Sequence, residues 1–179
     1  MTQLLKLAHW IDRINDKTAF VAKWAVILSC FISAANAFVR YVFAYSSNGW
    51  LEIQWYMFAA CVMLGSAQVL RLNEHVRVDV IYGQLKTRTR VIIDLMGLVL
   101  FLMPVMTLFI YLSFPLFVGM LVSGEMSPSA GGLIRWPVML LLPLGFTLVF
   151  AQGISEIIKR VAWLKNVYDM EIHYERPLQ

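Results

Sequence analysis

Long apolar runs alternate with short charged segments along this chain. A bilayer crossing needs about 20 mainly apolar residues in a helix. Four runs are long enough, and we expect membrane spans at about residues 24–45, 50–70, 91–123 and 136–158. The pattern therefore predicts an all-α membrane protein with four transmembrane helices, in which residues 1–179 form a single integral membrane domain.

The third run is longer than a span requires, because it stays uncharged from Leu95 to Ser123. A helix of that length must tilt, kink or end in a segment that lies on the membrane. Pro104 and Pro115 are the expected kink points, since proline removes a backbone hydrogen bond. Pro137 differs, because it stands at the start of the fourth run, where a missing N–H costs nothing.

The segment before the first run has a helical pattern of its own. Apolar residues recur at helical spacing from Leu4 to Ile14, with Trp10 among them, and most charges lie elsewhere on the wheel. This pattern is typical of an N-terminal amphipathic interfacial helix, which we expect over residues 4–21, flat on the inner surface. A disordered tail is the alternative. The run from Trp24 is too long for a signal peptide, so we interpret it as an uncleaved span.

Basic residues are distributed unevenly among the segments that flank the runs. Of the 15 lysines and arginines, only Arg40 and Arg135 fall in the first and third loops, and the others lie in the tails and the second loop. Lysine and arginine favour the cytoplasmic side, so we expect both termini in the cytoplasm. Basic residues at membrane edges, rather than in one patch, do not indicate nucleic-acid binding.

The composition supports the membrane interpretation and narrows the possible chemistry. Hydrophobic residues make up 60% of the chain and charged residues 15%, against about 25% charged in soluble domains. Cys30 and Cys61 are isolated in apolar runs, which argues against a disulfide framework and a zinc site. The three histidines lie outside the runs, which argues against a haem held between helices.

The sequence gives little support for catalysis by this chain, or for transport by this chain alone. No G-x-S-x-G motif is present. No Asp, Glu, Lys or Arg lies at the midplane of a span, where a self-sufficient carrier usually places its site. We therefore expect no catalytic residue, no cofactor and no metal site, and we expect a subunit that depends on a partner.

Charged and aromatic residues at the span ends are the candidates for a partner interface. Anchoring explains the two arginines of RLNEHVRVDV, residues 71–80. It does not explain the other ionisable groups there, which indicate hydrogen bonding within the chain or to a neighbour. Glu52 either pairs with Arg40 or contacts a partner. The expected interface residues are Arg40, Trp50, Glu52, Arg71, Glu74, His75, Arg77, Asp79, Glu125 and Arg135.

Two stretches of the chain resemble the small membrane subunit of tripartite ATP-independent periplasmic (TRAP) transporters. The first is WLEIQWYMFAACVMLGSAQVLRLNEHVRVDV, and the residues that carry the similarity are Trp50, Glu52, Gly65, Glu74, His75, Val78 and Asp79. The second is PSAGGLIRWPVMLLLPLGF, in which they are Pro137, Pro143 and Gly145. One departure is that many members have two adjacent acids where this chain has Glu52 and Ile53.

The resemblance implies a non-catalytic subunit of a sodium-coupled transporter that imports an organic acid across the bacterial inner membrane. In such systems a large membrane subunit carries the sodium and substrate sites, and a periplasmic binding protein delivers the acid. The small subunit is a scaffold for the large one, surrounded by membrane lipids. The binding protein would approach residues 48–52 and 125–135. The alternative function is a membrane anchor subunit of a redox enzyme complex.

Overall fold

A computed structural model describes residues 1–45, 47–73 and 84–169 of the chain. Four helices in this part are long and apolar enough to cross a membrane, which confirms the predicted all-α fold with four spans. No strand occurs in the described ranges. The elements are α1 (Thr2–Phe43), α2 (Asn48–Leu72), α4 (Thr87–Gly97), the π-helical turn η1 (Leu98–Leu102), α5 (Met103–Ser123) and α6 (Trp136–Leu164).

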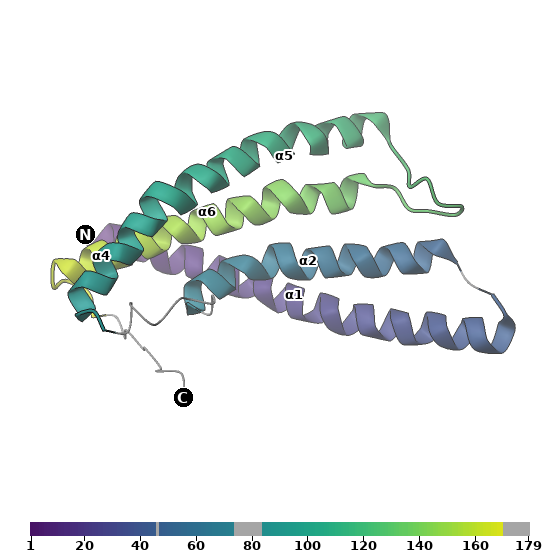
Figure 1. Cartoon of the computed structure of the whole chain (residues 1–179), viewed down its shortest axis with the longest axis horizontal. Coiled ribbons are helices and arrows are strands. Elements are labelled where there is room, and N and C mark those ends of the chain that lie inside the picture. Colours follow the sequence, from purple (N-terminus) through teal and green to yellow (C-terminus); the bar gives the residue numbers. More distant parts are fainter. Residues whose placement is uncertain (46, 74–83, 170–179) are drawn as a thin grey trace.

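Two antiparallel helix pairs, α1 with α2 and α5 with α6, make up the fold (Figure 1). α6 joins the pairs, because it packs against α1 and α2 as well as α5. We call the end that holds the start of α1 and the end of α6 the polar end. The opposite end, with the end of α1, the start of α2 and residues 124–135, is the loop end. The polar end is at the left of Figure 1 and the loop end at the right.

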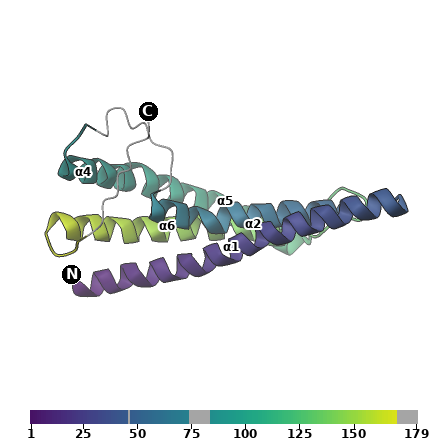
Figure 2. The same cartoon turned by 90° about the horizontal axis from the view of Figure 1, so that it is seen from below.

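α1 is one unbroken helix of 42 residues, about 63 Å long at 1.5 Å per residue. Residues 4–21 are helical, as expected. This helix continues straight into the first span (Figure 2), whereas a separate helix lying flat on the membrane surface was expected. The physical reason is that no glycine or proline precedes Gly49, so nothing ends the helix between the two segments.

The face of α1 that packs inward also differs from the expected apolar face. Leu7 and Trp10 are 44% and 59% exposed, whereas Asp12 and Asn15 are buried. Ala8 and Ile11, which belong to the expected apolar set, are buried as well. The inward stripe therefore combines small residues with polar ones, because this stripe meets polar groups of α6 rather than lipid.

The long third run forms a single helix from Thr87 to Ser123, in which η1 ends two residues before Pro104. Pro104 has no N–H to donate to the carbonyl group one turn earlier, and a π-turn is a common way to accommodate such a break. Pro115 lies inside α5. Pro137 lies in the first turn of α6, as predicted.

α2 and α6 approach most closely where Gly145 of α6 faces Met63 of α2. A Cβ atom added to Gly145 would lie 2.8 Å from the Cβ atom and 2.9 Å from the carbonyl oxygen of Met63. Part of this obstacle is backbone, so a side-chain rotation cannot relieve it. The absence of a side chain at residue 145 therefore sets the distance between the two helix pairs.

We expect Gly145→Ala to destabilise the protein, because the added methyl group forces α2 and α6 apart. The cost of such overpacking is about 1–3 kcal/mol. Thermal unfolding in detergent micelles measures it. Gly119→Ala is the matched control, since nothing lies within 4 Å of a Cβ atom added there. Equal stability of the two variants would contradict the close contact between α2 and α6.

Candidate functional site

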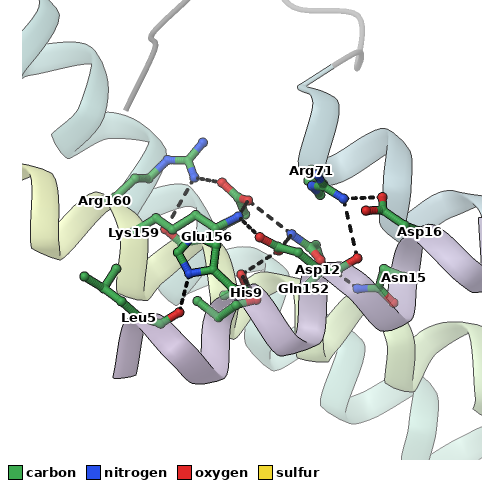
Figure 3. A network of polar contacts seen from close by, with 12 residues as sticks. Leu5, His9, Asp12, Asn15, Asp16, Arg71, Gln152, Glu156, Lys159 and Arg160 are labelled. Carbon is green, nitrogen blue, oxygen red and sulfur yellow. Dashed lines mark hydrogen bonds and ion pairs between the residues drawn. The ribbon is translucent and has the colours of Figure 1, made fainter. Parts of the chain in front are cut away.

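A buried polar network joins α1 to α6 at the polar end (Figure 3). Gln152 of α6 is fully buried at its centre. Its Nε2 group donates to Oδ1 of Asp12 at 2.9 Å and to Oε1 of Glu156 at 3.1 Å. Its Oε1 atom accepts from Nδ2 of Asn15 at 2.6 Å. Both amide hydrogens of Gln152 are therefore used, as a polar side chain without access to water requires.

Charged side chains complete this network. Nζ of Lys159 lies 2.7 Å from Oδ2 of Asp12 and 3.0 Å from Oε1 of Glu156. Arg160 forms an ion pair with the other carboxylate oxygen of Glu156 and lies 3.6 Å from Oδ2 of Asp94 on α4. Glu156, Lys159 and Arg160 meet because they are spaced three and four residues apart on one helix. The network thus connects α1, α4 and α6.

α2 reaches the same region through Arg71. This arginine forms an ion pair with Asp16 and donates to the backbone oxygen of Asp12 at 3.4 Å. The last turn of α2 is therefore fixed to α1 at the polar end. Arg71, expected at a partner interface, has partners within its own chain.

A second polar cluster lies at the loop end around Glu52 of α2. Glu52 is 5% exposed. Its carboxylate accepts from the Ser127 hydroxyl and, at 2.7 Å, from the backbone N–H of Leu133. Arg40 is exposed in the last turn of α1 and is not among its partners, so the predicted Arg40–Glu52 pair is wrong. Glu52 instead fixes the 124–135 loop onto the start of α2.

Other contacts hold the same loop in a compact form. Nδ2 of Asn48 donates to the backbone oxygen of Ala130 at 3.0 Å, and the Tyr56 hydroxyl donates to that of Ile134 at 3.2 Å. Arg135 and Glu125 form an ion pair at 2.6 Å, with both side chains partly exposed. The 124–135 loop therefore has a defined structure and is held against the first turns of α2.

The expected interface residues fall into separate groups. Trp50, Glu52, Glu125 and Arg135 gather at the loop end, whereas Arg71 lies at the polar end. Trp50 is 43% exposed. Four further members of the set lie outside the described residues: Glu74, His75, Arg77 and Asp79.

Sequence reasoning missed the network at the polar end. The helical pattern of residues 4–21 places its charges away from the apolar face, and the basic residues after the fourth run fit membrane anchoring, so neither pattern indicates that Asp12 meets Lys159. The available signal was the spacing of Gln152, Glu156 and Arg160, which places three polar groups on one face of α6. Within the described ranges, no group of three or more His, Cys, Asp or Glu residues could hold a metal ion.

Lys159→Met tests the network at the polar end. The substitution leaves Asp12 and Glu156 close to each other without their shared cation, and breaking such a buried pair costs about 3–5 kcal/mol. We expect a corresponding loss of unfolding free energy in detergent micelles. Lys165→Met, at an exposed position just after α6, should change stability by less than about 0.5 kcal/mol. A similarly small effect at Lys159 would show that its ion pairs do not hold α1 against α6.

Glu52→Met tests the attachment of the loop. The substitution keeps the side-chain length but removes both carboxylate acceptors, so the backbone N–H of Leu133 loses its hydrogen-bond partner. We expect hydrogen exchange at the Leu133 amide to accelerate by about ten-fold or more. Glu125→Met is the control, because its exposed ion pair contributes only about 0–1 kcal/mol. Unchanged exchange in Glu52→Met would contradict the role of this carboxylate.

Comparison with known proteins gives one family match. Residues 29–162 match the family described as "Tripartite ATP-independent periplasmic transporters, DctQ component". No curated protein and no solved structure matches the chain. The matched region runs from the middle of α1 nearly to the end of α6 and includes Glu52, Gly145, Gln152 and Glu156. The chain therefore belongs to the DctQ family, the small membrane component of TRAP transporters.

Proposed function

We propose that this chain is the non-catalytic scaffold subunit of a sodium-coupled importer of an organic acid. The observation that supports this role is the use of its buried carboxylates. Asp12 and Glu156 hold helices together, and Glu52 holds a loop. A transport site needs polar groups that can exchange partners with an ion or a substrate. We therefore assign sodium and substrate binding to the large membrane subunit.

The orientation that we propose follows from the distribution of lysine and arginine. The polar end, with the start of α1 and the end of α6, would face the cytoplasm of a bacterial cell and the loop end the periplasm. A periplasmic binding protein would then approach residues 48–52 at the start of α2 and residues 125–135 of the compact loop. The segment that contains Glu74, His75, Arg77 and Asp79 would lie on the cytoplasmic side, where the large subunit can contact it.

The surface along α5 supports a role within a larger membrane assembly. Ser113 is the one residue of α5 that is buried, and large apolar side chains such as Leu112 and Phe114 are more than half exposed. Such a surface is compatible only with lipid or with another apolar protein surface. We propose that membrane lipids and the large subunit share it.

The family match does not support the alternative function, a membrane anchor of a redox enzyme complex. The two functions are distinguishable by absorbance spectroscopy of the purified chain. A bound haem or flavin would favour the anchor and oppose the scaffold.

Reconstitution tests the scaffold proposal. We expect the affinity-tagged chain to co-purify with the large membrane subunit encoded in the same genome. In liposomes, we expect sodium-gradient-driven uptake of a labelled carboxylate only when the large subunit and the binding protein are both present. Liposomes with this chain alone should match empty ones. Uptake by the chain alone would overturn the proposal, as would full uptake by a complex that lacks it.

A further inference from the structure

An open groove of about 430 Å³ lies between α1 and α2 on the polar-end side of the first two spans. Its walls are mainly apolar or small, with Ala19 and Ala22 from α1 and Cys61, Val62 and Gly65 from α2. From Cys61 to Val69 it follows α2 for about 12 Å, at 1.5 Å per residue. The polar clusters around Gln152 and Glu52 are filled by side chains of this chain, whereas this groove is open on the outer side of the helices.

One charged side chain, that of Lys23, lines this groove. Lys23 is exposed and makes no ion pair with any described residue, whereas Arg71, in the last turn of α2, is paired with Asp16. Side chains on a helix lean towards its N-terminus, which for α1 is the polar end. We therefore expect the ammonium group of Lys23 to extend towards the part of the groove that Gln68 lines.

The neighbouring residues indicate the depth of Lys23 in the membrane. Trp24, which follows it, is 51% exposed, and exposed tryptophans gather at the level of the lipid headgroups. From Trp24 to Val39 α1 has no charged residue. Lys23 is therefore the last cation before the apolar part of the span, at the depth where lipid phosphates lie.

We propose that this groove binds one phospholipid with an anionic headgroup. The phosphate would lie against Lys23, with the polar side chains of Gln68 and Ser66 beside it. One acyl chain would follow Val62 and Cys61 towards the bilayer centre. The lipid would thereby fill the space between α1 and α2 that their side chains leave open.

A lipid is favoured over a protein segment by the combination of charge and location. A protein occupant would have to supply both an acidic group at the depth of Lys23 and an extended apolar segment that fits the groove. An anionic phospholipid has a negative headgroup and a flexible apolar chain in this order, and it is present throughout the surrounding membrane. Lipid binding in this groove does not depend on which substrate is transported, and it is independent of the scaffold proposal.

Native mass spectrometry of the full chain, released from detergent after incubation with phosphatidylglycerol or phosphatidylcholine, tests this site. We expect phosphatidylglycerol to be retained in preference to phosphatidylcholine. Lys23→Gln should reduce that preference by about five-fold, the factor expected for one lysine beside an anionic headgroup. Lys6→Gln is the matched control, because Lys6 is also exposed on α1 but lies outside the groove, and it should leave the preference unchanged.

A second variant tests the apolar part of the groove. Gly65 has room for a side chain, since an added Cβ atom would meet only the Cβ atom of Ala22 at 3.8 Å. Gly65→Leu should fill the groove and reduce retention of both lipids, with helical content by circular dichroism as the check on folding. If that variant does not fold, the comparison of Lys23→Gln with Lys6→Gln decides alone.

Several results would overturn the proposal. These are equal retention of both lipids by the wild type, an unchanged preference in Lys23→Gln, or full retention by folded Gly65→Leu. Loss of the bound lipid when the large subunit assembles with the chain would also overturn it, because the groove would then belong to the interface between subunits.

Discussion

The structure depends on one electrostatic constraint: a carboxylate removed from water needs a cation or several hydrogen-bond donors beside it. Asp12 and Glu156 satisfy this constraint by sharing Lys159. The sharing is possible only when the start of α1 lies against the end of α6. Gln152 adds directional hydrogen bonds to the same two carboxylates, so sliding α1 along α6 would leave several buried groups without partners. These contacts therefore fix the register of the two helices.

The buried carboxylates at the two ends of the molecule have different kinds of partner. At the polar end, side chains from separate helices satisfy one another, which joins the elements laterally. At the loop end, Glu52 is satisfied by a hydroxyl and a backbone N–H of one loop, which orders that loop without joining further helices. Between the ends, the contact of Gly145 with Met63 is made by packing alone. The buried charged groups thus lie near the ends and close packing predominates between them, as a hydrocarbon environment favours.

The apolar runs predicted the four helices because lipid contact demands long uncharged segments, which a single sequence displays directly. The continuity of α1 was harder to predict, since an amphipathic pattern shows which face is polar and not whether one helix joins the next. The absence of glycine and proline before Gly49 was the useful signal. The partners of Glu52 could not be predicted, because one is the backbone N–H of Leu133, and no residue type marks a backbone donor.

The π-helical turn at Leu98–Leu102 has a consequence for how this helix tolerates insertions and deletions. A π-turn contains one residue more than the α-helical turn it replaces, while the helix on either side keeps its rotational phase. Removing one residue from η1 would restore regular α-helical geometry and leave Asp94 facing Arg160. The same deletion elsewhere between Thr87 and Ser123 would rotate one half of the helix against the other. Changes in chain length within this helix are therefore best accommodated beside Pro104.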